Sequence, residues 1–98
     1  MTQAMKLMVK EIIVKDLNIR EIIEIIEPLS SVLKDRTLCD FYIQKRFLED
    51  DAEQREKYDE RIRWAEDEEK ENINDAEAVL RKYELDFDVE ELLGTEPW

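Results

Sequence analysis

The sequence predicts an all-α fold: a small helical bundle or helical hairpin with one long charged helix. One glycine and two prolines in 98 residues are too few for the turns that a β-sandwich or barrel needs about every eight to twelve residues. Apolar residues recur at steps of three and four, and several helix-capping patterns precede them. A chain of this length is one domain, so residues 1–98 are treated as a single unit.

A first helix is predicted over residues 5–15. Its apolar residues fall on one side of a helix, at positions Met5, Met8, Val9, Ile12 and Ile13. The segment also contains three consecutive β-branched residues, which favour strands. A short strand from Lys6 to Val14 is therefore the alternative.

The second helix is predicted to begin at Ile19. Asn18 is a good N-cap, Glu21 stands three residues later, and Leu17 and Ile22 occupy the two hydrophobic staple positions. The apolar face of this helix is formed by Ile19, Ile22, Ile23, Ile26, Leu29, Val32 and Leu33, widened by Ile25. Because proline removes a backbone hydrogen bond, we expect the helix to kink at Pro28, or to end and restart there.

A third helix is predicted to begin near Leu38, after the weaker capping pair Thr37 and Asp40. An apolar stripe then continues through Leu48, Ala52, Arg55, Tyr58, Ile62, Ala65, Glu69, Ile73, Ala76, Leu80 and Tyr83. A helix unbroken over residues 38–83 would be about 69 Å long, too long for a compact domain of this size. Asn74 with Glu77 forms another capping pattern, so we expect a break at residues 71–74 and a helix over residues 75–83.

The long charged segment also has the spacing of salt bridges along a helix. Three acid–base pairs lie four residues apart, Glu53 with Lys57, Asp59 with Arg63 and Glu66 with Lys70. Each such pair contributes about 0.2–0.5 kcal/mol to helix stability.

A short last helix is predicted over Val89–Leu93. Asp88 and Glu91 form a capping box, and Gly94 provides the stop. Phe87 and Leu92 occupy the staple positions, and we expect the last four residues to form a frayed tail.

Charge divides the chain more sharply than any motif. The first 48 residues contain 7 acids and 8 bases, whereas the remaining 50 contain 20 acids and 7 bases. Apolar residues are concentrated in the first half. We therefore assign core-forming helices to residues 1–48, an acidic long helix to residues 49–83, and a short capping helix and tail to residues 84–98.

The residue types present argue against catalysis and bound cofactors. There is no histidine and a single cysteine, so the usual zinc, haem and thiol sites cannot be assembled from this chain. No glycine-rich phosphate loop or nucleophile elbow is present. Asp86, Asp88 and Glu90 resemble the start of a calcium loop, but Glu91 stands where the turn glycine belongs. We expect no enzyme activity, no cofactor and no metal, and we interpret Cys39 as a small helix residue.

The sequence also predicts the compartment of the protein. The longest apolar runs have three residues, far below the roughly 20 that a membrane span requires. The N-terminal segment lacks the continuous apolar region of a secretory signal. We therefore expect a cytoplasmic protein without membrane contact.

Direct nucleic-acid binding is disfavoured by the charge balance. Neutralising phosphates requires a basic patch, and the bases here are outnumbered by acids and interleaved with them. Lys6, Lys10, Lys45 and Arg46 give the first half a mildly basic character, but lysines beside an apolar helix face usually form its solvated rim.

The acidic helix is the candidate partner-binding surface. Residues 49–72 contain twelve acids over about 36 Å, or one carboxylate about every 3 Å. A DNA strand presents one phosphate per roughly 3.4 Å, so the densities are comparable. The candidate partner-binding residues are Glu49, Asp50, Asp51, Glu53, Glu56, Asp59, Glu60, Trp64, Glu66, Asp67, Glu68, Glu69 and Glu71.

Trp64 lies off the apolar stripe, which suggests an exposed contact residue; packing on the N-terminal helices is the alternative. A merely solvated charged helix is the simpler interpretation of the whole segment.

In size, acidity, helicity and lack of catalytic residues, the segment Glu49–Trp98 resembles small phage-encoded inhibitors of the anti-CRISPR and anti-restriction type. Some of these imitate nucleic acid. The resemblance implies a protein-binding inhibitor that occupies the basic nucleic-acid-binding site of a CRISPR effector or restriction enzyme. Because it depends on no shared motif, no family residue is transferred to this chain.

Two other functions fit the same sequence. One is a homodimeric coiled-coil adaptor that uses the stripe from Leu48 to Leu80 as its seam. The other is an antitoxin-like module that neutralises a basic toxin, which the sequence does not separate from an inhibitor.

Overall fold

The computed structural model describes residues 2–94, which form four α-helices and no strand. α1 spans Gln3–Val14, α2 spans Ile19–Leu48, α3 spans Ala52–Lys82 and α4 spans Val89–Leu93. The all-α prediction is confirmed. The alternative of a short N-terminal strand is wrong, because that segment is helical throughout α1.

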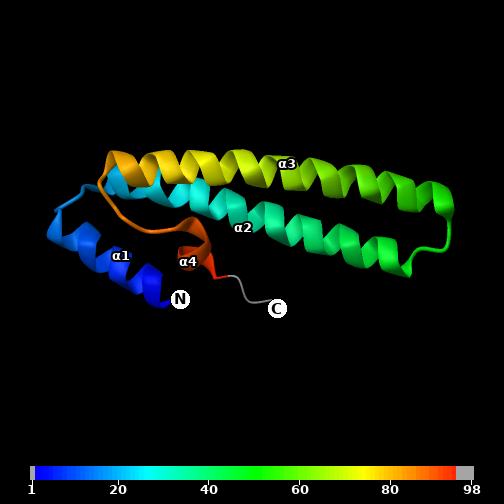
Figure 1. Cartoon of the computed structure of the whole chain (residues 1–98), viewed down its shortest axis with the longest axis horizontal. Coiled ribbons are helices and arrows are strands. Elements are labelled where there is room, and N and C mark those ends of the chain that lie inside the picture. Colours follow the sequence, from blue (N-terminus) through cyan, green and yellow to red (C-terminus); the bar gives the residue numbers. More distant parts are fainter. Residues whose placement is uncertain (1, 95–98) are drawn as a thin grey trace.

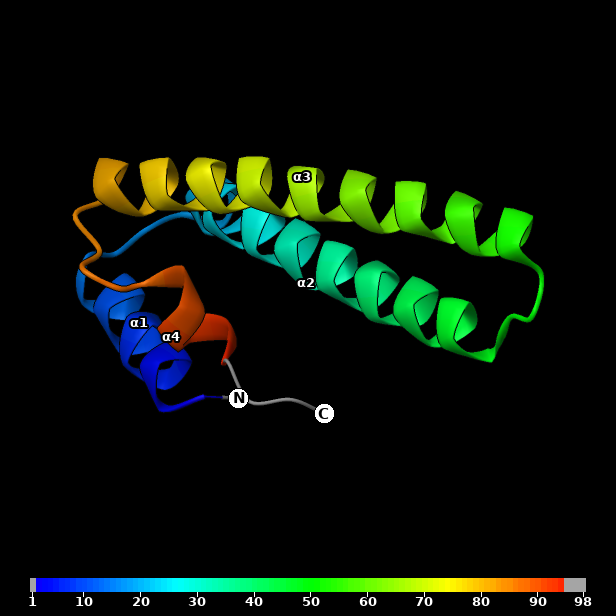
Figure 2. The ribbon, with the colours of Figure 1, turned by 45° about the vertical axis from the view of Figure 1, so that its right-hand side comes forward.

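The molecule is an elongated helical hairpin with two short helices at one end. α2 and α3 run antiparallel along its length (Figure 1), and the described part measures 54 × 21 × 19 Å. α1 and α4 lie side by side where α2 begins and α3 ends (Figure 2). The opposite end consists only of the two long helices and the loop between them. We call these two parts the core end and the arm.

α1 begins with a cap that also joins the two short helices. The hydroxyl oxygen of Thr2 accepts a hydrogen bond from the amide of Met5 at 3.1 Å, which satisfies one of the unpaired amides of the first turn. The same hydroxyl donates to the carbonyl oxygen of Leu92 at 2.7 Å. After α1, Asp16 adopts a positive φ of 56° and turns the chain toward α2.

α2 starts at the predicted capping box. The side-chain oxygen of Asn18 accepts from the amide of Glu21 at 3.0 Å, and the Glu21 carboxylate accepts from the amide of Asn18 at 2.9 Å. Each residue satisfies a backbone donor of the other. The predicted start at Ile19 is confirmed.

Of the two alternatives predicted for Pro28, the end and restart of the helix is wrong, because α2 continues through Pro28 to Leu48. The predicted third helix near Leu38 is consequently the middle of α2. Thr37 does not act as an N-cap: its hydroxyl donates to the carbonyl oxygen of Leu33, one turn earlier, at 2.9 Å.

Burial around Pro28 compensates for the cost of the proline. A proline inside a helix costs about 3 kcal/mol. Full burial of a large apolar side chain contributes about 1.5–3 kcal/mol. Ile25, Leu29 and Val32, on either side of Pro28, are all at most 3% exposed. Their combined burial is large enough to keep the segment helical.

The loop between the long helices occupies Glu49–Asp51, a position that the sequence did not predict. Asp51 is the N-cap of α3 and accepts a hydrogen bond from the amide of Glu53 at 3.0 Å. The predicted break at residues 71–74 is wrong, because α3 runs through it. The predicted cap Asn74 lies inside the helix, and within the same segment the Asn72 side chain donates to Asp35 of α2 at 2.6 Å, which joins the two helices.

α4 has the predicted bounds but not the predicted cap. Asp88 stands at the N-cap position, yet its side chain makes no capping hydrogen bond. Gly94 follows the helix with a positive φ of 82°, a conformation that glycine adopts without strain. The predicted frayed tail lies outside the described residues.

The hydrophobic core is concentrated at the core end. It is formed by Met8, Ile12, Ile25, Leu29, Ala76, Leu80, Leu85, Val89 and Leu92. All four helices and the segment before α4 contribute to it, so the core does not belong to residues 1–48 alone. Within residues 36–72, which form the arm, Ala65 is the one buried hydrophobic side chain.

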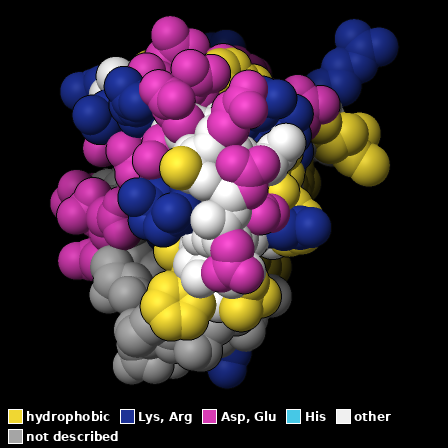
Figure 3. Space-filling model, turned by 90° about the vertical axis from the view of Figure 1, so that its right-hand side faces the viewer, with side chains coloured by type: hydrophobic (Ala, Val, Ile, Leu, Met, Phe, Trp, Pro, Cys, Tyr) yellow, Lys and Arg dark blue, Asp and Glu magenta, His cyan; other side chains and the backbone are white. Residues whose placement is uncertain are grey.

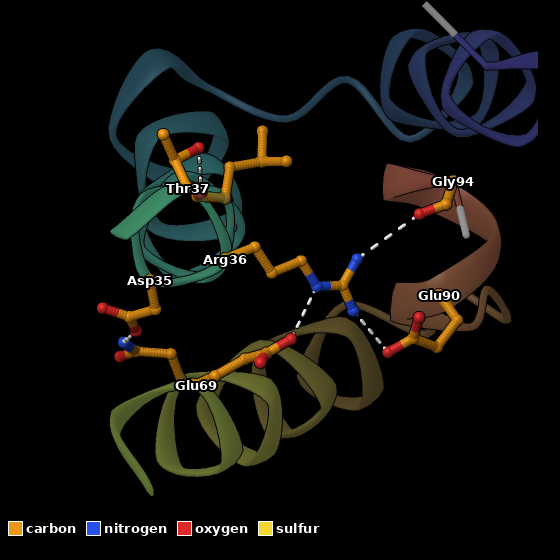
Figure 4. Close-up of polar contacts among 8 residues, drawn as sticks. Asp35, Arg36, Thr37, Glu69, Glu90 and Gly94 are labelled. Carbon is orange, nitrogen blue, oxygen red and sulfur yellow. Dashed lines mark hydrogen bonds and ion pairs between the residues drawn. The ribbon is translucent and has the colours of Figure 1, made fainter. Parts of the chain in front are cut away.

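Polar contacts hold α4 against the hairpin. The Arg36 guanidinium of α2 lies between α3 and α4 (Figure 4). It donates to the carboxylates of Glu69 at 2.6 Å and Glu90 at 2.5 Å, and to the carbonyl oxygen of Gly94 at 3.4 Å. Burial lowers the pKa of Arg36, but the contacts with Glu69 and Glu90 outweigh it and raise that pKa overall. One side chain therefore links three helices.

Candidate functional site

The candidate partner-binding residues lie in the α2–α3 loop and in the first two thirds of α3. Their side chains are solvent-exposed at Asp50, Asp51, Glu53, Glu56, Glu60, Trp64, Glu66, Asp67 and Glu71. They are half-buried at Glu49, Asp59, Glu68 and Glu69. None is buried, so these candidate residues do not point into the core.

Two acids of the loop have a structural role. Asp51 caps α3, and the Glu49 carboxylate accepts a hydrogen bond from the amide of Asp51 at 3.2 Å. These bonds satisfy backbone donors at the point where the chain reverses. Glu49 and Asp51 therefore help to form the turn between the two long helices.

Two of the twelve acids in residues 49–72 form ion pairs within the described chain. Glu69 pairs with Arg36 at 2.6 Å, and Asp59 pairs with Arg46. Both bases belong to α2. The predicted pair of Asp59 with Arg63 is wrong, since Asp59 contacts α2 instead, and the other two intrahelical pairs are not formed in this part of the chain either.

Five acids lie on the side of α3 that points away from α2, with the exposed Arg63 between Glu60 and Asp67. We define the outer acidic face as Glu53, Glu56, Glu60, Asp67 and Glu71, all of them exposed. At 100° per residue they lie opposite the buried Ala65, which faces α2. The face extends about 27 Å from end to end. None of its acids belongs to an ion pair within residues 2–94.

Figure 3 looks along the hairpin onto the closed end of the arm. Acidic side chains are spread over the part of this view that belongs to α3, among lysine and arginine side chains. Hydrophobic side chains reach the surface between the charges. The end of the arm is thus charged, with apolar groups accessible.

Trp64 is an accessible apolar side chain of α3. Its side chain is 54% exposed, so it does not pack on the N-terminal helices. On a helix its surface neighbours are the residues three and four positions away: Glu60, Arg61, Asp67 and Glu68. A large aromatic surrounded mostly by carboxylates is thereby presented to solvent.

Cys39 faces the inner side of the acidic helix and is half-buried. Burial raises the pKa of its thiol, and the negative charges of Glu66, Asp40 and Glu69 raise it further. A raised pKa keeps the sulfur in its protonated, unreactive form at neutral pH. This environment is the opposite of the one that activates a cysteine.

The apolar stripe of α3 contacts α2 of the same chain. Ala65, Ala76 and Leu80, which belong to the seam predicted for a coiled-coil dimer, are at most 2% exposed. They are covered by intrachain packing. A second chain would have to displace α2 in order to use this seam.

Other sites considered from the sequence are placed as follows. Glu90, one of the calcium-like acids, contacts Arg36, and within residues 2–94 no three metal-ligating side chains come close enough to hold an ion. Lys45 and Arg46 lie near the end of α2, where Lys45 stands over the ring of Phe41 and Arg46 pairs with α3. None of the described helices is long and apolar enough to cross a membrane.

The structure also reveals an apolar surface that the sequence did not predict. Ile25, Leu29 and Val32 of the predicted α2 face are buried, whereas Ile19, Ile23, Ile26 and Leu33 are between 40% and 73% exposed. The breadth of the apolar face was the available signal, because one neighbouring helix covers only part of so wide a face.

Comparison of the chain with protein families, with curated proteins and with solved structures finds no match. The functional interpretation therefore depends on the surface of α3 itself.

Proposed function

We propose that this protein is a protein-binding inhibitor that presents the acidic surface of α3 to the basic nucleic-acid-binding site of a target protein. A CRISPR effector or a restriction enzyme has a site of this kind, and the inhibitor would then act in the host cytoplasm. The outer acidic face carries the proposal, because its five carboxylates are exposed and free of ion pairs within the described chain.

The spacing of these acids suits a site built for phosphates. Five carboxylates over about 27 Å stand about 7 Å apart on average, and alternate phosphates of one DNA strand are about 7 Å apart. A row of lysine or arginine side chains in the target's site that contacts every second phosphate would meet a carboxylate of α3 at a similar interval. Long-range attraction between opposite charges would also accelerate the encounter.

The exposure of Trp64 favours binding of a protein partner over the interpretation that α3 is merely a solvated charged helix. Aromatic side chains are enriched among the residues that contribute most to binding energy. An exposed tryptophan within an acidic surface combines an apolar anchor with charge complementarity. Solvation alone accounts for the acids but provides no reason for the exposure of Trp64.

The test is capture of target proteins from host lysate at about 50 mM and about 500 mM salt, because screening weakens electrostatic binding. We expect captured protein to be released by high salt and by competing DNA. The variant E56Q/E60Q/D67N/E71Q removes four charges from the outer acidic face and should lose capture. The matched control E11Q/D16N/E27Q/D86N removes four exposed acids elsewhere and should retain it.

Equal loss in both variants would attribute capture to net charge, and unchanged capture in both would contradict the proposal. An antitoxin-like function uses the same surface against a basic toxin. The position of the gene, beside a toxin gene or among phage early genes, separates the two.

A further inference from the structure

The side of α2 that faces away from α3 carries an uncharged stripe along its full length. We define the α2 stripe as Ile19, Ile23, Ile26, Ser30, Leu33, Thr37, Phe41, Gln44 and Leu48, which follow one another at steps of three and four. All nine residues are exposed. In a chain with 43% charged residues, a solvated helix face is not expected to have nine successive exposed positions, three or four residues apart, without a charge.

The intrachain contacts of α2 show that the stripe is unpartnered. Glu24, Asp35 and Arg46 contact α3, and Arg36 contacts both α3 and α4. At 100° per residue the three α3-facing residues lie roughly opposite the stripe. Its apolar members range from 40% exposed at Leu33 to 77% exposed at Leu48.

We propose that the α2 stripe binds the α2 stripe of a second copy of this chain, with the two helices antiparallel. The midpoint of α2 lies between Leu33 and Lys34. Reversal about this midpoint places Ile19 opposite Leu48, Ile26 opposite Phe41, and Ser30 opposite Thr37. Two of these pairs join large apolar residues and one joins two small hydroxyl residues, whereas Ile23 lies opposite Gln44 and Leu33 lies opposite the edge residue Lys34. This self-match is what a two-fold symmetric interface requires.

The dimensions predict a weak dimer. α2 has 30 residues and extends about 45 Å, and a helix contact about 10 Å wide covers about 450 Å² on each chain. The total of about 900 Å² lies below the range of stable interfaces, among weak and transient ones. A small domain with a core at one end also gains stability from association.

The charges beside the stripe give the dimer a distinctive signature. Arg20, Lys34 and Lys45 lie along one edge of it, with Glu27 between them. Antiparallel two-fold symmetry places this edge opposite itself, so Lys34 comes near Lys34 of the second copy. Added salt and the variant Lys34→Gln should both strengthen the dimer, because both reduce this repulsion.

The experiment is sedimentation equilibrium of the full chain up to about 1 mM, since an interface of this size binds weakly. We expect the mass to rise from 11.9 kDa toward twice that value. The variant I26D/F41D should remain monomeric. The control Val14→Asp, at an 85% exposed site on α1, should dimerise normally. A monomer at all concentrations, or a dimer that I26D/F41D does not affect, would overturn the proposal.

Cross-linking tests the antiparallel register without relying on a variant that could unfold. In a Cys39→Ser background, S30C/T37C should form interchain disulfides, because positions 30 and 37 of opposite chains are adjacent. S30C alone should not, because its two copies lie about 10 Å apart along the helix axis. Efficient cross-linking of S30C alone would indicate a parallel pair and would contradict the proposed arrangement.

A membrane surface is the competing occupant, because an apolar stripe with a basic edge also suits anionic lipid. Vesicles of phosphatidylcholine and phosphatidylglycerol are the probe. Binding of the monomer to these vesicles, weakened by Lys34→Gln, would overturn the proposal of a dimer.

The dimer does not depend on the proposed inhibitor function. The variant I26D/F41D should leave target capture unchanged, and the variant E56Q/E60Q/D67N/E71Q should leave the dimer unchanged.

Discussion

Individual polar side chains join the two long helices where apolar burial is scarce. Asp35 is 1% exposed, and its carboxylate accepts a hydrogen bond from Asn72 at 2.6 Å. A hydrogen bond to a buried carboxylate favours one relative position of the two helices, because sliding one past the other would leave Asp35 buried and unsatisfied. We interpret this pair as setting the register that brings Arg36 to Glu69 and Arg46 to Asp59.

Glu24 makes the stability of the core end depend on pH. Its carboxylate accepts from Lys82 at 2.7 Å and from the hydroxyl of Tyr83 at 2.5 Å. These hydrogen bonds, first that of Lys82, lower the pKa of Glu24 below its ordinary value of 4.5. The folded state therefore binds fewer protons here than the unfolded state. The stabilisation is fully present above pH 4.5 and is lost as the pH falls through the lower folded pKa.

The variant Glu24→Gln tests this prediction. We expect wild type to lose more stability than the variant between about pH 6 and about pH 3, measured as the midpoint of urea unfolding. Glu27→Gln, three residues further along the exposed surface of α2, is the control and should follow wild type. Parallel pH profiles for wild type and Glu24→Gln would refute the role of this carboxylate.

At the scale of single helices, Pro28 is the residue most at odds with its position. It lies inside α2, nine residues after Ile19, where a proline cannot donate to the preceding turn. We expect Pro28→Ala to stabilise the protein by about 1–3 kcal/mol, because it restores that hydrogen bond and removes the steric clash. Chemical denaturation measures the change, with Gln44→Ala as a helix-surface control. A destabilised variant would mean that the hairpin depends on the shape that Pro28 imposes.

Helix starts could be predicted where the capping residues act on their own backbone. Asn18 and Glu21 form such a box within four residues, and the structure contains it. Thr37 and Asn74, two other predicted caps, are also capping residue types, but they lie inside helices. The side chain of Asn72 contacts Asp35, 37 residues away in the sequence. Local spacing cannot reveal a partner so distant, and the predicted break at residues 71–74 was therefore wrong.

The division of the apolar face of α2 could not be predicted either. Ile25 and Ile26 are adjacent and chemically identical, yet they are 1% and 48% exposed. Which of them is buried depends on the side from which α3 and α4 approach. That direction follows from packing of the whole chain, whereas the pattern only reveals that the face is broad.

The exposure of the acidic residues was the most predictable feature of the candidate site. Twelve acids within 24 residues cannot all be buried, so most had to face solvent. The pairs formed by Glu69 and Asp59 were not predictable, because they depend on the α2–α3 register. The exposure of Trp64 was one of two alternatives, and only the packing of α3 decided between them.

At the scale of the whole molecule, the core end and the arm differ in stability. Large buried side chains gather at the core end, whereas the arm has Ala65 and a few polar contacts such as Arg61 with Tyr42. Few buried apolar contacts allow local opening at low free energy. We expect amides in residues 38–48 and 53–63 to exchange with solvent faster than those in residues 25–32 and 76–80.

Hydrogen exchange followed by mass spectrometry measures this difference directly. Below the concentration at which the chain dimerises, the two sets of peptides should separate clearly. Uniform protection along α2 and α3 would mean that the hairpin unfolds as one unit, contrary to this prediction. Binding of a target to the outer acidic face should slow exchange chiefly in the arm.

The hydrogen bond from the Thr2 hydroxyl to the Leu92 carbonyl oxygen has a practical consequence for labelling the protein. It holds the start of the described chain beside its last helix, far from the closed tip of the hairpin (Figure 1). A tag or fluorophore attached just before Thr2 would therefore lie at the core end, away from the outer acidic face. Immobilised this way on a sensor chip, the molecule would project its tip toward the analyte, with α3 unobstructed.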